Sequence, residues 1–167
     1  MILLDNNILS TFARVHELDL LFRLFPKDKL GVSPTVHDDM MHAIRLGCSF
    51  LEAAAQMIRG GRLDIVPLTP AEISAKHGLP PSFGAADAEC IIVCRERGDT
   101  LLTNDRRVRN FCRTAGIIVF DLPQLLRALW ENGILTRRHA RRLADQMESA
   151  ENMVIKNKEA IFKTSRR

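Results

Sequence analysis

Carboxylates occur at four places along this chain where an α/β fold could bring them together: Asp5, Asp38 with Asp39, Asp87 with Glu89, and Asp105. Asp5 directly follows the apolar run 2–4, and Asp105 lies just past the apolar segment 100–103. Open parallel sheets place their ligands at the carboxyl ends of their strands. Carboxylates that converge there repel one another unless a cation lies among them. Oxygen ligands of this kind suit a hard divalent ion such as Mg²⁺.

Each of these acids also has a purely structural interpretation. Asp is a preferred residue at the start of a helix, so Asp5 and Asp105 can be ordinary helix caps. Asp87, in a first helical turn, is favoured by the helix dipole. Two strands of one sheet that both end in Asp favour a shared cation site, because independent caps have no reason to match. Asp39 lies about one turn into its helix and can point back to the same edge, while Asp38 beside it is an alternative.

Strand-like and helix-like segments alternate along the chain. Apolar runs predict strands at 2–5, 30–33, 63–68, 100–103 and 117–120. Helical periodicity and capping residues predict helices at 8–25 (broken near His16), 34–46, 49–59, 85–97, 106–114 and 121–133, with a further helix start at Thr69. This alternation predicts an α/β fold in which helices cover both faces of a parallel sheet.

The last segment, residues 136–167, differs from the rest in its charge. It holds nine Lys or Arg and four Asp or Glu, a net +5; the whole chain is +4, so residues 1–135 carry −1. Thr136 can cap a helix that the apolar steps at 140, 143, 147, 150, 154 and 161 extend to about Lys163. We therefore predict a domain over 1–135 and a basic helical extension over 136–167. The charge of the extension indicates either a polyanionic partner or a solvated face.

Composition places the chain among ordinary globular proteins. Of its 167 residues, 46% are hydrophobic and 26% are charged. No apolar run approaches the roughly 18 residues of a membrane span, and no secretory signal precedes the first strand. The cysteines have no paired CxxC spacing and are predicted to be free thiols: Cys48, Cys90, Cys94 and Cys112. These features predict a cytoplasmic protein without a membrane partner.

Several other kinds of site are disfavoured by the sequence. It contains no phosphate-binding lysine loop, no GxGxxG after the first strand and no GxSxG. His37 and His42 are five residues apart, which does not place two zinc ligands on one helix face. Phosphatases of the haloacid type also use an Asp after the first strand, but they need a second Asp where this chain has Asn7.

Four segments, in order, resemble the motifs of PIN-domain nucleases, a family that includes VapC-type toxins. These segments are 3–9 (LLDNNIL), 32–40 (VSPTVHDDM), 84–91 (GAADAECI) and 101–107 (LLTNDRR). Residues 116–133 look like the closing strand and helix of that family, so the resemblance covers about residues 1–135. It implies a three-layer α/β/α sandwich whose central parallel sheet has the strand order 3-2-1-4-5.

The resemblance also implies site residues and a cofactor. The catalytic positions are Asp5, Asp39, Asp87 and Asp105. Of these, Asp5, Asp87 and Asp105 are expected to bind Mg²⁺ or Mn²⁺. Supporting positions are Asn7, Asp38, Glu89, Thr103 and Asn104. The second acid of the family is usually Glu, so the shorter Asp39 would reach the metal through water, or Asp38 would take its role.

Contact with RNA is expected through phosphates rather than base stacking, because the chain has one Trp and no Tyr. The expected contacts are Arg106, Arg107, Arg137, Arg138 and Arg141. The first two adjoin an acidic position. The other three stand at the start of the last predicted helix, where cations oppose the helix dipole. The alternative for these three is pairing with acids such as Asp145.

Two hypotheses about function follow. The first is a metal-dependent endoribonuclease, the toxin of a toxin–antitoxin pair, with RNA, an antitoxin protein and a second copy of the chain as partners. The second is a catalytically weak PIN-like module that binds RNA or a protein. Mg²⁺ binding together with EDTA-sensitive cleavage of RNA distinguishes the two.

Overall fold

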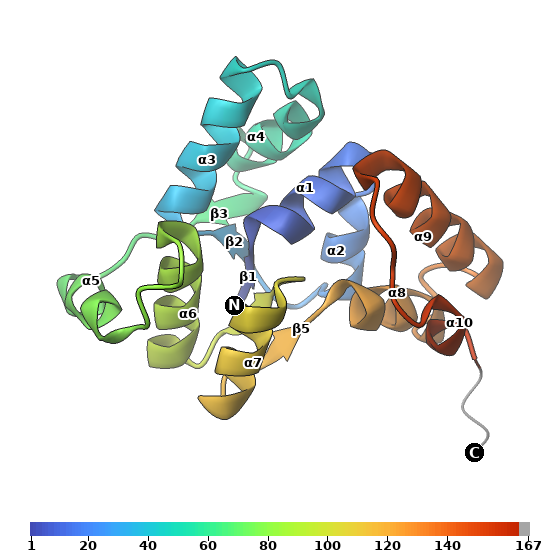
Figure 1. Cartoon of the computed structure of the whole chain (residues 1–167). Coiled ribbons are helices and arrows are strands. Elements are labelled where there is room, and N and C mark those ends of the chain that lie inside the picture. Colours follow the sequence, from blue (N-terminus) through green and yellow to red (C-terminus); the bar gives the residue numbers. More distant parts are fainter. Residues whose placement is uncertain (164–167) are drawn as a thin grey trace.

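A single sheet of five parallel strands forms the centre of the protein, in the order β3-β2-β1-β4-β5 (Figure 1). The computed structural model describes residues 1–163. The strands are β1 (Ile2–Leu4), β2 (Leu30–Val32), β3 (Leu63–Ile65), β4 (Thr100–Leu102) and β5 (Val119–Phe120). The predicted fold class and strand order are confirmed. β3 is shorter than predicted, and Pro67 beyond it has no amide hydrogen to continue the ladder.

The central strand β1 is hydrogen-bonded to β2 on one side and to β4 on the other. Leu3 lies opposite Gly31 of β2 and Leu101 of β4. Gly31 is required by packing, because a Cβ atom there would lie 2.6 Å from Cγ2 of Val66. Since β1 and β4 are neighbours and parallel, the residues that follow them emerge side by side at one edge of the sheet.

Helices pack on both faces of this sheet, as the alternating pattern predicts. They are α1 (Asn6–Arg14), α2 (Asp19–Leu24), α3 (Pro34–Arg45), α4 (Glu52–Arg59), α5 (Pro70–Ala75), α6 (Ala85–Arg97), α7 (Arg106–Thr114), α8 (Leu122–Glu131), α9 (Arg137–Glu151) and α10 (Lys158–Ile161). Two short 3-10 helices, η1 (Ser49–Leu51) and η2 (Lys76–Gly78), precede α4 and follow α5. The break between α1 and α2 falls at His16, which has a φ of 59°. Within residues 1–163, none of the helices combines the length and apolar character needed to cross a membrane.

The C-terminal segment is not the single long helix that its apolar steps predict. Helix α9 ends at Asn152, which takes the left-handed conformation with a φ of 49°. The side chain of Glu148 then accepts a hydrogen bond from the backbone N–H of Ile155 at 2.7 Å, which turns the chain back. Asn152 tolerates this conformation better than most residues do. Val154, expected in the apolar stripe, is consequently 81% exposed.

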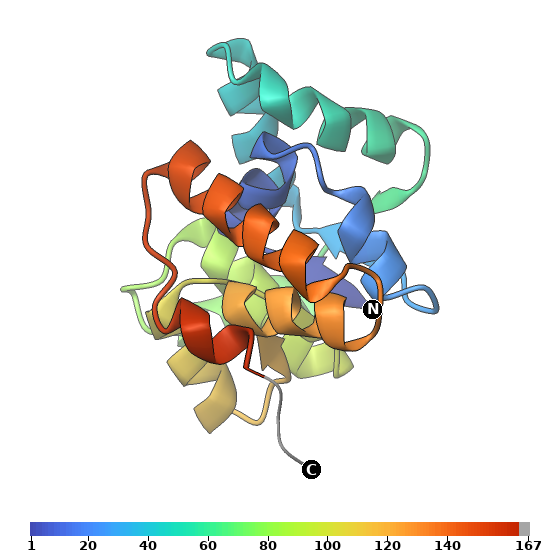
Figure 2. The ribbon, with the colours of Figure 1, turned by 90° about the vertical axis from the view of Figure 1, so that its right-hand side faces the viewer.

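Helix α9 lies across α1 and α8 on the outer side of the molecule (Figure 2). Ala140, Leu143 and Met147 on its inner side are buried in the same core as the sheet. The indole N–H of Trp130 in α8 donates to the backbone oxygen of Ile161 at 3.1 Å. The segment after α9 is therefore fastened to α8, close to the carboxyl edge of the sheet.

The cysteines are free thiols, as the sequence predicts. Cys90, Cys94 and Cys112 are buried, whereas Cys48 is half-buried. Burial raises the pKa of the Cys112 thiol to about 11 and raises the pKa values of Cys90 and Cys94 as well. All three therefore stay protonated and pack as small apolar side chains.

Glu72 joins α5 to the end of α6. It is buried, and Arg97 of α6 donates to its two oxygens from Nε at 2.6 Å and from Nη2 at 2.7 Å. Thr69 completes a capping box with it at the start of α5. The hydrogen bonds from Arg97, with those from Thr69, outweigh burial and lower the pKa of Glu72 to about 2. This connection fixes the far end of the helix that carries Asp87 at its start.

We expect Glu72→Gln to lower the free energy of unfolding by about 2 kcal/mol, because it removes the negative charge and turns one of the two oxygens that accept from Arg97 into an NH2 donor. Urea unfolding measures this loss. The contribution of Glu72 is present above its unfolded pKa, near 4.5, and is lost as the pH falls through about 2. Glu96→Gln is the matched control, since Glu96 is exposed on the same helix and pairs with Arg95. Equal effects of the two substitutions would contradict the role given to Glu72.

Candidate active site

Asp5 is a buried carboxylate at the end of β1, and it is only 4% exposed. Its Oδ1 atom accepts the backbone N–H of Asn6 at 2.6 Å, so Asp5 does cap α1. Its Oδ2 atom accepts two further hydrogen bonds, from Nδ2 of Asn7 at 2.5 Å and from the hydroxyl of Thr103 at 2.6 Å. Asp5 is therefore both a helix cap and a carboxylate fixed from two strands.

Thr103 and Asn7 connect the end of β4 to the end of β1. Thr103 is completely buried, and its hydroxyl oxygen also accepts the backbone N–H of Asp105 at 3.1 Å. The side-chain oxygen of Asn7 accepts the backbone N–H of Asn104 at 2.8 Å. These hydrogen bonds fix the orientation of the Asp5 side chain relative to the backbone of residues 103–105.

Asp5 lies at the bottom of an acidic hollow of about 430 Å³. We use the name acidic hollow for the cavity lined by Asp5, Asn6, Asn7, Thr35, Asp39, Gly84, Ala85, Ala86 and Asp87. Three separate elements supply its carboxylates: the end of β1, helix α3 and the start of α6. Among the described lining residues there is no Lys, Arg or His. Three carboxylates therefore share one hollow without a cation in its wall.

The electrostatics of Asp5 and Asp87 reflect this crowding. Burial raises the pKa of Asp5 above its usual 3.8, and the charge of Asp87 raises it further, against the hydrogen bonds from Thr103, Asn6 and Asn7. Burial also raises the pKa of Asp87, and the charge of Asp105 adds to this effect. A divalent ion in the hollow would relieve this repulsion.

Asp105 lies at the margin of the acidic hollow and is not part of its lining. Its Oδ1 atom caps α7 by accepting the backbone N–H groups of Arg107 at 2.7 Å and Val108 at 3.1 Å. Burial is the main cause of the raised pKa of Asp87, and the charge of Asp105 raises it further. Asp105 is thus placed beside the other acids but is engaged in a structural role.

The neighbouring residues Asp38 and Asp39 differ clearly in their positions. Asp39 lines the acidic hollow, and its Oδ2 atom accepts a hydrogen bond from Nδ2 of Asn6 at 2.8 Å. Asp38 points elsewhere: its side chain is 82% exposed and lies 3.3 Å from Nδ1 of His37. Of the two candidates, the geometry favours Asp39.

On the ribonuclease hypothesis that the resemblance to PIN nucleases implies, we expect Asp39→Asn to lower RNA cleavage by about 10- to 100-fold, the range seen when a residue that supports a metal site is replaced. Asp38→Asn should leave cleavage unchanged, which makes it a control of identical chemistry one residue away. Initial rates of cleavage, measured at several Mg²⁺ concentrations, test the pair. The reverse order of effects would assign the role to Asp38.

Glu89 is buried outside the acidic hollow. Its Oε2 atom accepts the backbone N–H of Thr35 at 2.9 Å, and its Oε1 atom pairs with Nζ of Lys76 at 3.1 Å. Burial raises the pKa of Glu89, but the hydrogen bonds from Thr35, Lys76 and Ser33 outweigh it and lower the pKa overall. Glu89 therefore holds the start of α3 against α6 and, through it, the helix that carries Asp39.

The five candidate arginines occupy two different regions. Arg106 and Arg107 are exposed at the start of α7, and Nε of Arg107 lies 4.0 Å from Asp105. Arg137, Arg138 and Arg141 stand at the start of α9, and none of them lines the acidic hollow. Arg141 pairs with Glu159 at 2.5 Å, whereas Asp145 pairs with Lys158 at 2.7 Å. Arg141 therefore pairs with a nearby acid, as the structural alternative predicts, but its partner is Glu159 and not Asp145.

Two polar residues of the acidic hollow, Asn6 and Thr35, have no role predicted from the sequence. Asn6 donates its backbone N–H to Asp5 and its side-chain N–H to Asp39, so it connects two of the acids. Thr35 lines the hollow next to the first turn of α3. The position of Asn6 next to Asp5 is a sequence signal for a role in the site. Asn7, one residue further on, has the same side chain, so the sequence does not show which of the two amides contacts the acids.

The donor types of the acidic hollow fit a magnesium-class ion that is held incompletely by protein. Within residues 1–163, no three His, Cys, Asp or Glu side chains are grouped so that they could hold a metal ion by themselves. Mg²⁺ commonly keeps several waters and uses one or two carboxylates together with substrate phosphate. Asp5 and Asp87, with raised pKa values and no cation in the lining of the hollow, provide such a pair.

A parallel sheet of order 3-2-1-4-5, with carboxylates gathered at its carboxyl edge, defines an α/β/α protein of the PIN type. The family model DUF3368, described as a PIN domain, matches residues 1–161, and the chain belongs to this family. Among solved structures, it is similar to a chain in the "Crystal structure of VapBC2 from Rickettsia felis bound to a DNA fragment from their promoter". That match has a TM-score of 0.52 and 18% identity, and covers 72% of this chain and 98% of that chain. No curated protein gives a significant match.

Proposed function

We propose that this protein is a Mg²⁺- or Mn²⁺-dependent endoribonuclease that hydrolyses RNA phosphodiester bonds at the acidic hollow. The observation that carries the proposal is the meeting of Asp5, Asp39 and Asp87 in one cavity without a cation in its wall. Membership of the PIN-domain family and the motif resemblance to PIN nucleases support the same reaction class.

In this proposal Asp5 and Asp87 hold the ion, while Asp39 and Asp105 act through water. A bound divalent ion would lower the pKa of a coordinated water and neutralise charge on the phosphate oxygens. The groups that donate hydrogen bonds to Asp5 orient its carboxylate. The Thr103 hydroxyl and the Asn7 amide fix its Oδ2 atom before substrate arrives, which limits the reorganisation needed for reaction.

We further propose that the protein is the toxin of a toxin–antitoxin pair, acts in the cytoplasm and forms a homodimer. The VapC-like motifs support this biological role, and so does the fold shared with a chain of the VapBC2 structure. An antitoxin protein, encoded next to this chain, is the expected partner. Co-expression of the two genes should yield a stable complex and suppress the cleavage activity.

The proposal is tested by incubating the purified protein with a structured RNA in Mg²⁺, in Mn²⁺ and in EDTA. Cleavage with either ion, its loss in EDTA and its return on adding excess Mg²⁺ are the expected results. Mg²⁺ binding is measured in parallel by calorimetry. RNA binding without EDTA-sensitive cleavage would overturn the enzyme assignment and favour a catalytically weak PIN-like binding module.

A further inference from the structure

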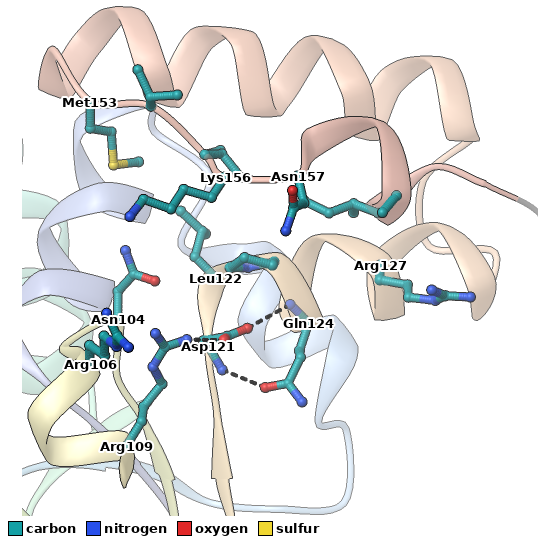
Figure 3. Close-up of a pocket in the computed structure, with 15 residues that line it drawn as sticks. Asn104, Arg106, Arg109, Asp121, Leu122, Gln124, Arg127, Met153, Lys156 and Asn157 are labelled. Atoms are coloured by element: carbon teal, nitrogen blue, oxygen red, sulfur yellow. Dashed lines mark hydrogen bonds and ion pairs between the residues drawn. The ribbon is translucent and has the colours of Figure 1, made fainter.

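A second and larger cavity, of about 660 Å³, opens at the same edge of the sheet (Figure 3). We call it the basic hollow; its walls are the start of α7, the start of α8 and the segment 153–161. Its charged lining residues are Arg106, Arg109, Arg127, Lys156 and Asp121. Four cations thus face one carboxylate, the reverse of the charge balance in the acidic hollow.

Two of these cations are already neutralised within the protein. Arg109 forms an ion pair with Asp121, and Arg127 pairs with Glu131 at 2.8 Å. Arg106 and Lys156 are exposed, and within the described part of the chain neither forms an ion pair. The excess positive charge of the basic hollow therefore rests on one residue from α7 and one from the C-terminal segment.

These two residues converge from opposite walls. Figure 3 shows the side chain of Lys156 extending from the C-terminal segment toward Asn104 and Arg106. The left-handed turn at Asn152 is what makes this possible, because a continuous helix would carry Lys156 away from α7. The departure from the predicted long helix thus places a lysine beside the end of β4.

The basic hollow adjoins the acidic hollow through Asn104. This residue lines the basic hollow, while its backbone N–H is bound to Asn7, the residue that holds Asp5. A strand that presents a phosphate to the acidic hollow must overcome repulsion from three carboxylates. Cations immediately beside that site would hold the neighbouring phosphates and offset this repulsion.

We propose that the basic hollow binds the phosphodiester backbone of single-stranded RNA next to the scissile phosphate, with Arg106 and Lys156 as the two phosphate contacts. This inference rests on the proposed nuclease function. Val154, which is 81% exposed, and the half-buried Pro123 in the same lining provide apolar surface for a sugar or base. An acidic protein segment is the competing occupant, but the position beside the acidic hollow favours the substrate.

The test is fluorescence anisotropy with a labelled single-stranded RNA of mixed sequence, in EDTA, over a series of salt concentrations. Lys156→Gln and Arg106→Gln should each weaken binding several-fold and reduce the slope of log K against log salt by about one unit. The double variant should reduce it by about two units. Both residues are exposed, so thermal unfolding should be unchanged.

Two substitutions remove the same charges elsewhere and serve as matched controls. Arg113→Gln changes the opposite end of α7, and Lys27→Gln changes the turn before β2, at the amino edge of the sheet. Equal binding by controls and hollow variants would overturn the inference. So would an effect of the hollow variants on binding of a polyglutamate peptide but not of the RNA, which would assign the basic hollow to an acidic protein segment.

The outcomes separate this inference from the proposed function. EDTA-sensitive cleavage, together with RNA binding that is unchanged in the Lys156 and Arg106 variants, would support the nuclease function and contradict RNA binding in the basic hollow. RNA binding that depends on both residues, without cleavage in Mg²⁺ or Mn²⁺, would support the basic hollow as an RNA-binding site and contradict the nuclease function.

Discussion

Asp5→Asn is expected to lower the rate of RNA cleavage by about 10³-fold or more. The substitution removes the charge of the carboxylate that is fixed from both central strands and points into the acidic hollow. Asn can still cap α1, because Asn and Asp are equally good at that position. It loses an acceptor for Asn7 or Thr103 but also removes a buried charge, so the free energy of unfolding should change by about 1 kcal/mol or less.

Cleavage of a labelled RNA under single-turnover conditions measures this effect. Urea unfolding and RNA binding in EDTA show whether the variant is folded and still holds substrate. Asp38→Asn, an exposed Asp→Asn change close to the same site, controls for loss of charge alone. Turnover by Asp5→Asn at the wild-type rate would be incompatible with the assigned site.

Asp87→Asn is expected to make the metal-free protein slightly more stable at neutral pH and to remove most of its stabilisation by Mg²⁺. Burial and the charge of Asp105 raise the pKa of Asp87, so the folded state disfavours its ionised form. The contribution of such a group is present below its unfolded pKa and is lost as the pH rises through the raised folded value. At neutral pH the carboxylate therefore costs stability, and Asn removes this cost while keeping an acceptor for Gly84.

In contrast, the stabilisation of the folded protein by Mg²⁺ should be smaller in Asp87→Asn than in the wild type. A ligand present at 100 times its Kd stabilises the folded state by about 2.7 kcal/mol, and the variant should lose most of this gain. Urea unfolding of both proteins in EDTA and in Mg²⁺ gives the two effects together. Asp28→Asn, in the exposed turn before β2, should alter neither. A variant that is less stable in EDTA and responds fully to Mg²⁺ would show that Asp87 is only a helix-dipole residue.

Much of the fold follows from patterns that are local in the sequence. Short apolar runs mark the strands, and capping residues such as Ser33, Thr69 and Asp121 mark helix starts, as the structure confirms. The strand order came from the resemblance to PIN domains and is confirmed as well. The turn at Asn152 could not be predicted, because the apolar steps continue past it and Asn is compatible with both conformations. The turn is stabilised by contacts that form only once the chain has turned: Glu148 binds the backbone of Ile155 and the amine of Lys158.

The roles of the site residues are only partly readable from the sequence. Asp87 and Glu89 lie two positions apart in the motif, and residues with this spacing on a helix do not share a face. Asp87 therefore lines the acidic hollow, while Glu89 turns toward Thr35 and Lys76. The basic hollow has no sequence signature, since Arg106 and Lys156 meet only because the C-terminal segment folds back over α8.

One divalent ion is expected to bind in this protein between carboxylates from separate elements. A crystal structure with Mn²⁺, in which anomalous scattering locates the ion, tests it most directly. Mn²⁺ is expected in the acidic hollow, in contact with Asp5 and Asp87, with water as its other ligands. Mn²⁺ bound at another surface, with the acidic hollow empty at a concentration that supports cleavage, would contradict it.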